Sequence, residues 1–315
     1  MVRFLLKRGL TLFISMFVLS VLIFILSAVM PIDPALTVLG RESTPETRAA
    51  LTEQLGLNRP LPERYLDWVG NFLRGNWGES YRLGVAILPL VQRRLLNSVV
   101  LAVLALTIIV PVSLTLGVIA GLKEGQPVDR SISVGSLVSI SIPDFVIGLI
   151  LIVIFSWWLR LLPGDSSLRG DDLDLLRDWR KLVLPAFTAA FVLIGYVARV
   201  TRVSMISVMG SAYIRTAILK GLPYRWVVLR HALRNALIAP IAVITTQVAW
   251  LVGGLIVIER LFNYPGIGSL FADAALRNDL PMIQASAMIA ITLVVASQAL
   301  ADVLYAVLNP RIQMS

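Results

Sequence analysis

Residues 95–122 read LLNSVVLAVLALTIIVPVSLTLGVIAGL and contain no charged side chain. A helix needs about 20 predominantly apolar residues to cross a hydrocarbon layer roughly 30 Å thick, so this stretch is long enough to span a membrane. Similar apolar blocks recur along the chain, and they predict further helices over residues 9–30, 131–159, 182–208, 236–258 and 280–308. The sequence therefore predicts six membrane-spanning helices.

The composition indicates the same class of protein. Hydrophobic residues make up 57% of the 315 residues, charged residues make up 15%, and the mean hydropathy is +0.82. Soluble domains carry about 25% charged residues. A soluble helical bundle is the alternative, but its core helices seldom stay uncharged over such lengths. We therefore expect an all-α, polytopic protein embedded in a lipid bilayer.

The residue types present exclude several kinds of site. The chain has no cysteine and a single histidine, His231. Disulfides, thiolate metal sites and cysteine nucleophiles are thereby excluded, and we expect no metal site built from histidine. The net charge of +9 is typical of some nucleic-acid-binding proteins. Here, however, the basic residues lie mostly in short segments between apolar blocks, which is typical of membrane topology and headgroup contacts, so we expect no nucleic-acid partner.

Basic residues also predict the orientation, because they favour the cytoplasmic side. Arg3, Lys7 and Arg8 place the N-terminus inside, and the apolar block that follows is longer than the core of a signal peptide. Six spans then return the C-terminus, with Arg311, to the cytoplasm. The same parity places loop 209–235 inside, in a region with no acidic residue and with the cations Arg199, Arg202, Arg215, Lys220, Arg225, Arg230 and Arg234.

This topology divides the chain into an N-terminal tail with the first span (1–30), an external segment (31–94) and a core (95–315) that holds the other spans. In the external segment, Thr44 can cap a helix that starts at Pro45 and ends at Gly56. A second short helix is expected over residues 63–74, with its apolar stripe at Tyr65, Val69, Phe72 and Leu73. Three nearby aromatic residues either anchor the chain at the membrane surface or form a docking surface for an external partner: Trp68, Trp77 and Tyr81.

One ionisable residue lies near the middle of a predicted span. Asp144 follows Pro143 within residues 131–159, and proline removes a backbone donor and kinks a helix. Asp144 therefore either caps the second half of a kinked helix or lines a translocation pathway, since charges at membrane depth are costly and often functional. The chain has no phosphate-binding glycine loop, so we expect no ATP bound to this chain.

The cytoplasmic loop carries the strongest pattern: SAYIRTAILKGLPYRWVVLRHALRNALIAPI, from Ser211. Ile214, Ala217, Ile218 and Gly221 fall on one face of a short helix, which Gly221 can end before Pro223 starts the next. Such an amphipathic helix either lies at the lipid headgroups or docks into a groove on a cytosolic partner.

This loop resembles the coupling motif, often called the EAA loop, of bacterial ABC-importer permeases. Arg215-Thr216-Ala217 stands where that motif has Glu-Ala-Ala, and Gly221 matches its glycine. The sequences YIRTA (213–217) and RHALRNAL (230–237) are similar to the corresponding segments of the dipeptide, oligopeptide and nickel branch. Other segments similar to that branch cover nearly the whole chain: Pro31-Ile32-Asp33-Pro34, LNRPLPERY (57–65), FNYPGIG (262–268), and Leu304-Tyr305 to Asn309-Pro310-Arg311.

Two residues depart from the pattern. Arg215 replaces the acidic residue of the general motif, so a contact made by glutamate is not assumed. Asn309 stands where the branch often has aspartate. The long external segment resembles the first of the two permeases in such a system.

The resemblance implies a type I permease fold in the bacterial inner membrane. This chain would pair with a second, homologous permease to form half of a pathway, two cytosolic ATPase subunits would bind ATP and Mg²⁺, and an external binding protein would deliver the substrate. The residues expected to couple the pathway to the ATPases are Ala212, Tyr213, Ile214, Arg215, Thr216, Ala217, Lys220, Gly221 and Leu222. Gly221→Pro, or a bulky charge at Ala217, is then expected to uncouple uptake without preventing membrane insertion.

The resemblance favours peptides as substrate, with nickel, opines and sugar oligomers as alternatives. A secondary transporter or channel acting alone is a different class, and such proteins often show inverted repeats and paired intramembrane charges. The sequence shows neither feature. A membrane receptor or structural subunit is a third class.

Overall fold

The computed structural model describes residues 2–30, 34–40, 43–168 and 173–308. Over these residues the chain is helical and forms no strand, apart from an isolated bridge between Glu79 and Ala86. The predicted all-α class is therefore confirmed. Two matched segments of the resemblance, 31–33 and 309–311, lie outside the described residues.

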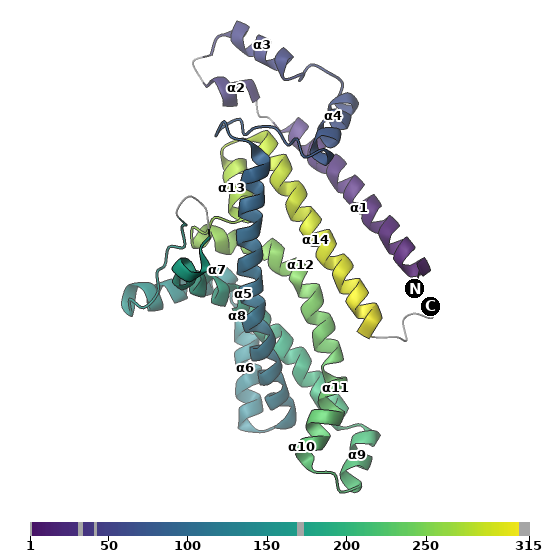
Figure 1. Cartoon of the computed structure of the whole chain (residues 1–315). Coiled ribbons are helices and arrows are strands. Elements are labelled where there is room, and N and C mark those ends of the chain that lie inside the picture. The colour runs from purple at the N-terminus through teal and green to yellow at the C-terminus, as the bar shows by residue number, and fades with distance from the viewer. Residues whose placement is uncertain (1, 31–33, 41–42, 169–172, 309–315) are drawn as a thin grey trace.

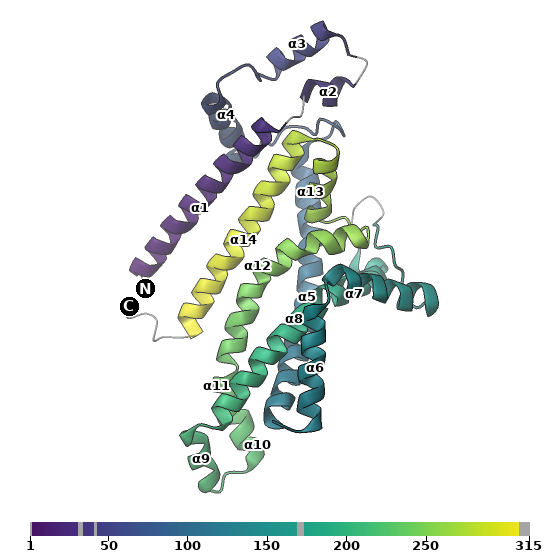
Figure 2. The same cartoon turned by 180° about the vertical axis from the view of Figure 1, so that it is seen from behind.

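Five long helices form the body of the molecule (Figures 1 and 2). They are α1 (Val2–Val29), α5 (Ile87–Leu122), α8 (Leu175–Met209), α12 (Ile238–Leu261) and α14 (Leu280–Leu308). Three short helices lie at one end of the body: α2 (Pro34–Leu39), α3 (Pro45–Gln54) and α4 (Leu61–Leu73). By length and apolar composition, four helices in the described part can cross a membrane, or six if each of two bent pairs counts as one span.

The predicted helix over residues 131–159 is instead broken into two parts. The first is α6 (Pro127–Ser141), and the second is α7 (Asp144–Leu151), which continues as the π-helix η1 (Ile152–Trp158). The two parts meet at an angle of 104°. The cause is Pro143, which forces the preceding Ile142 into an extended backbone conformation with φ −93° and ψ 126°. The change of direction is much larger than the kink that the sequence predicts.

Helices α5 and α8 pack closely because two glycines in the C-terminal half of α5 lie against α8. A Cβ atom added at Gly117 would lie 2.6 Å from the carbonyl oxygen of Ala198, and one added at Gly121 would lie 2.6 Å from Cβ of Met205. Glycines four residues apart allow this close approach of membrane helices. This pair was a signal in the sequence that our prediction did not use.

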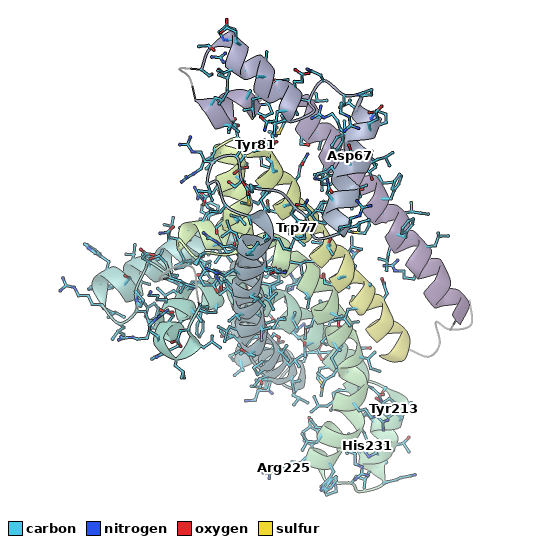
Figure 3. All side chains as sticks on the ribbon, turned by 45° about the horizontal axis from the view of Figure 1, so that its top comes forward. Asp67, Trp77, Tyr81, Tyr213, Arg225 and His231 are labelled. Atoms are coloured by element: carbon cyan, nitrogen blue, oxygen red, sulfur yellow. The ribbon has the colours of Figure 1, made fainter. Side chains whose placement is uncertain are left out.

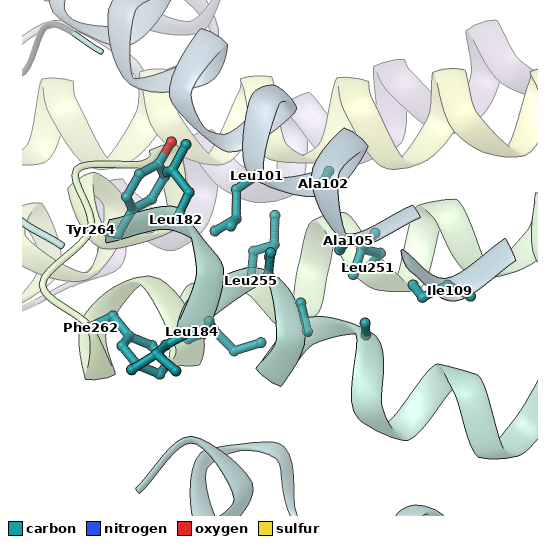
Figure 4. Packing of buried hydrophobic residues seen from close by; sticks show 14 of the residues in the cluster. Leu101, Ala102, Ala105, Ile109, Leu182, Leu184, Leu251, Leu255, Phe262 and Tyr264 are labelled. Carbon is teal, nitrogen blue, oxygen red and sulfur yellow. The ribbon is translucent and has the colours of Figure 1, made fainter. Parts of the chain in front are cut away.

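The main core lies where α5, α8 and α12 meet (Figure 4). Leu101 and Ile109 of α5 pack against Leu184 of α8 and Leu255 of α12. Tyr264, which follows α12, is also fully buried in this core. These contacts fix the loop after α12 against the first half of α5.

A second core joins the start of α5 to α13 (Ile267–Leu276) and to the start of α14. Next to it, the buried carboxylate of Asp279 holds the loop that precedes α5. Its oxygens accept a short hydrogen bond from the hydroxyl of Ser80 and bonds from the backbone N–H groups of Tyr81, at 3.2 Å, and Arg82, at 3.4 Å. One carboxylate thus fixes the junction between the segment after α4 and the bundle.

The external segment follows the predicted pattern in α3. Thr44 caps α3 by accepting a hydrogen bond from the N–H of Thr47 at 3.3 Å, Pro45 is the first helical residue, and Gly56 has a φ of +64° just beyond the helix end. The predicted Thr44 cap is therefore confirmed.

The aromatic residues of the external segment mostly pack within the chain. Trp68 lies between Phe24 of α1 and Phe72 of α4, and Trp77 stacks on Phe72 with ring centroids 4.4 Å apart. Tyr65 donates or accepts a hydrogen bond with Ser20 of α1 at 2.8 Å. These contacts attach α4 to α1, and a role of Trp68 and Trp77 as membrane anchors or as a docking surface stays a prediction.

Candidate functional site

The segment between α8 and α12 lies at the end of the molecule opposite the external helices, as the positions of Tyr213 and Tyr81 show (Figure 3). It forms α9 (Ala212–Leu219), the short helix α10 (Tyr224–Trp226), the π-helix η3 (Val227–Ala232) and α11 (Leu233–Ala236). The helix α9 and the chain from α10 to α11 therefore form a helical hairpin that precedes α12.

One stripe of α9 is buried against the other half of this hairpin, which runs from α10 to α11. Ile214 and Ala217 pack with Val227 and Ala232 of η3 and with Met205 of α8. Of the four residues predicted on one face, Ile214 and Ala217 are buried, whereas Ile218 is 48% exposed and Gly221 is exposed as well. The segment from α10 to α11 covers only a narrow stripe of α9, which is eight residues long, so the rest of the helix surface stays exposed.

The C-terminal end of α9 is closed by two backbone hydrogen bonds. The N–H of Gly221 donates to the carbonyl of Ile218 at 2.9 Å, and the N–H of Leu222 donates to that of Ala217 at 3.4 Å. This pair of bonds defines a Schellman cap, and its C′ residue takes a left-handed conformation. Gly221 has a φ of +75°, so the prediction that it ends the helix is confirmed.

The N-terminal half of α9 is attached to the hairpin by side chains. The amide of Asn235, on α11, donates to the hydroxyl of Tyr213 at 2.9 Å and to the carbonyl of His231 at 3.3 Å. The sequence gives no signal for the Tyr213–Asn235 contact, because the two residues lie 22 positions apart in separate helices.

The remaining predicted site residues face outward, and they leave apolar side chains exposed beside cations. Ala212, Arg215, Thr216 and Lys220 are exposed, and Leu219 is 80% exposed. We call the exposed apolar residues at this end the outward patch: Leu219, Leu222, Tyr224, Trp226 and Leu229. The guanidinium of Arg230 lies 5.8 Å from the ring centre of Trp226. Exposed apolar patches with a polar rim are typical of protein interaction sites.

The structure places Asp144 in the first turn of α7. Its carboxylate accepts a hydrogen bond from the N–H of Phe145 at 2.8 Å, and Pro143 is the cap residue. An acidic side chain in a first turn is favourable towards the helix dipole. An apolar cavity of about 630 Å³ is lined by residues of α5, α6, η1 and α8 and by Leu151 at the end of α7, and Asp144 is not among the described residues that line it. A role for Asp144 in a pathway stays a prediction.

A buried carboxylate at the end of α12 was not among the predicted site residues. Glu259 is fully buried and accepts hydrogen bonds from the hydroxyl of Ser98 at 2.5 Å and from the N–H of Ser269 at 2.8 Å. Tyr264 donates to the carbonyl of Asn97 at 2.8 Å, and burial raises the pKa of this phenol, so it stays protonated as a donor. The network ties α5, α12 and α13 together at the C-terminal end of α12.

A second contact that was not predicted joins α6 to α8. Arg202 of α8 binds Asp129 of α6 through two nitrogens, one of them at 2.8 Å from the carboxylate, and Asp129 also accepts from the N–H of Gly125 at 2.9 Å. Both oxygens of a buried carboxylate are thus satisfied, as a buried charge requires. From the sequence, Arg202 was predicted only as a determinant of topology.

Comparison with protein families gives two matches. Residues 113–314 match the family described as the inner membrane component of binding-protein-dependent transport systems, and residues 1–83 match the N-terminal part of such membrane components. Together these two regions include α9, the outward patch and the external helices.

Individual relatives match along almost the full length. The chain is 36% identical to a probable peptide ABC transporter permease of Sinorhizobium fredii, over 98% of this chain and 99% of the relative. It is 33% identical to an oligopeptide transport system permease of Bacillus subtilis, over 93% and 94%. It is 32% identical to a glutathione transport system permease of Escherichia coli K12, over 99% of both chains.

Proposed function

The chain belongs to the family of inner membrane components of binding-protein-dependent transport systems, and from this premise we propose that it forms half of the pathway of an ATP-driven peptide importer. It is a multi-pass protein of the bacterial inner membrane and a transport subunit. Permeases of this kind work with an ATPase and with a binding protein. The composition of the complex, its coupling site and its substrate are what the proposal adds.

The outward patch is the observation that supports coupling at α9. Its leucines and aromatic rings are exposed on α9, α10, η3 and the turn between α9 and α10, and Arg215, Lys220 and Arg225 flank them. An apolar helix face of this kind fits a groove on a partner protein. We assign that groove to a cytosolic ATPase, with one ATPase subunit under this chain and a second under a homologous permease. ATP and Mg²⁺ are bound by the ATPases.

Orientation follows from the same assignment. The patch end is cytoplasmic, in agreement with the basic residues of the loop, and the start of α1 and the end of α14 lie on that side of the membrane. The ion pair between Arg8 of α1 and Asp302 of α14 supports this topology. It joins the start of the first helix to the end of the last helix, so these two helix ends lie on the same side of the membrane. The external segment with α2, α3 and α4 then faces the binding protein.

Peptides are the substrate that the relatives support. The names of the Sinorhizobium and Bacillus relatives specify peptides and oligopeptides, and glutathione, which the Escherichia relative transports by name, is itself a tripeptide. The patch does not distinguish between substrates, because it lies at the end of the molecule away from the external segment.

Reconstitution of the whole complex tests the proposal. The chain is co-expressed with its neighbouring permease, ATPases and binding protein, purified through a tag on this chain, and placed in liposomes. We expect two ATPase subunits to copurify and labelled dipeptides or tripeptides to accumulate only with ATP. Competition by glutathione, longer peptides, Ni²⁺, opines and sugar oligomers identifies the substrate class. Uptake without the ATPases would contradict the proposed mechanism, and uptake of Ni²⁺ alone would contradict the peptide assignment.

A further inference from the structure

The coupling helix α9 is attached to the hairpin at three places. Its buried stripe, Ile214 and Ala217, packs on η3, and its Schellman cap closes the turn towards α10. Its first turn is held by the hydrogen bond from Asn235 to Tyr213. The buried stripe also shares its hydrophobic cluster with Ala236 of α11. Among the hydrogen bonds of the described residues, the Tyr213–Asn235 bond joins α9 to α11, the helix that leads directly into α12.

The chain between α11 and α12 has the properties of a hinge. The axes of residues 224–236 and of residues 238–248 differ by 43°, and Leu237 lies between them. Pro240, in the first turn of α12, has no N–H to donate to the carbonyl of Ala236, so the regular hydrogen-bond ladder of a helix is interrupted there. A push on α9 therefore meets a weak point directly after α11.

We propose that the Tyr213–Asn235 hydrogen bond makes α9, η3 and α11 a single rigid body, which turns about Leu237 when the ATPases close. Tyr213 and Asn235 are thus positioning residues: they hold α9 to the base of α12 so that displacement of α9 becomes rotation of α12. Without the bond, α9 can tilt on its narrow buried stripe while α12 stays in place. This inference rests on the proposed function, because it assumes that α9 receives the movement of an ATPase.

Coupling is the quantity that distinguishes this role from a contribution to folding. In the reconstituted complex, Tyr213→Phe removes the acceptor and Asn235→Ala removes the donor. We expect each variant to assemble with its ATPases and hydrolyse ATP, but to transport about threefold to tenfold fewer substrate molecules per ATP, as expected for loss of one hydrogen bond. The double variant should fall no further than either single variant, because both changes remove the same bond.

A matched control is available on α8. Tyr196 is also exposed, and its hydroxyl has no hydrogen-bond partner among the described residues. Tyr196→Phe therefore makes the same chemical change without breaking a bond, and it should leave the transport ratio unchanged.

Distances measured between spin labels test the rigid body directly, and the absence of native cysteine allows specific labelling. One label pair, at Thr216 and Arg234, lies within the proposed body, and a second, at Thr216 and Thr246, spans Leu237. On ATP binding the first distance should stay constant and the second should change. In the Asn235→Ala variant, the distribution of distances between the labels at Thr216 and Arg234 should broaden.

Two results would overturn the inference: an unchanged transport ratio in both single variants, or a change in the Thr216–Arg234 distance as large as that across Leu237. A wild-type complex that does not transport at all would instead contradict the proposed function. The two failures are therefore distinguishable.

Discussion

The carboxylate of Glu259 occupies the space that a side chain at Gly266 would need. A Cβ atom built on Gly266 would collide with the Oε1, Cδ and Oε2 atoms of Glu259. The carboxylate has little room to retreat, because Ser98 and Ser269 hold it by hydrogen bonds of 2.5 and 2.8 Å. Gly266, the first glycine of the PGIG segment (265–268), is therefore required by the buried carboxyl group of Glu259, which lies seven positions earlier in the chain.

Gly266→Ala should consequently destabilise the protein. We expect a loss of about 1–3 kcal/mol in the free energy of unfolding, as for other overpacked sites. The measurement is the thermal unfolding of the purified chain in detergent. Gly9→Ala in α1 is the control, because no atom lies within 4 Å of the added Cβ there. If both variants melt at the same temperature, the close contact with Glu259 is not rigid.

Asp129→Ala should destabilise the contact between α6 and α8. Asp129 is buried and Arg202 is 27% exposed, so the substitution leaves a mostly buried guanidinium without its carboxylate. We expect a loss of about 1–3 kcal/mol, below the value for a fully buried pair because water reaches part of Arg202. Thermal unfolding measures this loss.

The control for Asp129 is Asp67, which pairs with Arg59 at 2.5 Å on an exposed surface. Exposed pairs contribute little to stability, so Asp67→Ala should unfold close to the wild-type temperature. An equal effect of both substitutions would mean that burial does not decide the strength of the Asp129–Arg202 pair.

Asp279→Asn should release the loop before α5. The amide group would face at least one of the backbone N–H groups of Tyr81 and Arg82, which now donate to a carboxylate. We expect hydrogen exchange at these two amides to become faster, with little change in α12. Asp273→Asn, at an exposed ion pair with Arg260, serves as control and should leave the loop protected.

Gly221→Ala should reduce uptake, and Gly221→Pro should reduce it further. A φ of +75° costs an alanine about 1–2 kcal/mol, and proline can neither adopt this angle nor donate the hydrogen bond to Ile218. Membrane insertion should stay normal, because the turn lies between two short helices outside the long spans. Uptake per assembled complex is the measurement.

Gly210→Ala is the comparison for Gly221, since Gly210 has a φ of −75° and only ordinary contacts around an added Cβ. It should transport at nearly the wild-type rate. Wild-type uptake by Gly221→Pro would show that the shape of this turn is not needed for coupling. Ala217→Glu also tests the region, but Ala217 is buried, so the charge would disrupt the packing of α9 on Val227 and Val228 and not its outer surface.

The features that were predictable from sequence are those that depend on local chemistry. Apolar length predicted the helical membrane class, Thr44 and Pro45 predicted the start of α3, and Gly221 predicted the end of α9. Each of these rests on a few neighbouring residues. The bend at Pro143 was predicted in place but not in size, because the angle of 104° depends on how α7 packs against α8 and α12.

The features that were not predictable are contacts between distant residues. Asn235 and Tyr213, Arg202 and Asp129, and Glu259 with Ser98 are pairs whose members lie in different helices. Each residue alone is compatible with exposure to water or headgroups. The predicted apolar face of α9 is covered only in part within the chain. Periodicity indicates that a face is apolar but not how much of it a neighbouring segment covers.

The bond between Ser98 and Glu259 joins residues 161 positions apart, and this separation has a consequence for biosynthesis. At about 5–20 residues per second, Ser98 leaves the ribosome roughly 10–30 seconds before its acceptor exists. During that interval the outer end of α5 lacks the partner that satisfies it in the finished protein. The outer rim of the molecule is therefore among the last parts to assemble, and a chain stalled before α12 would present an incomplete α5 to the quality-control proteases of the membrane.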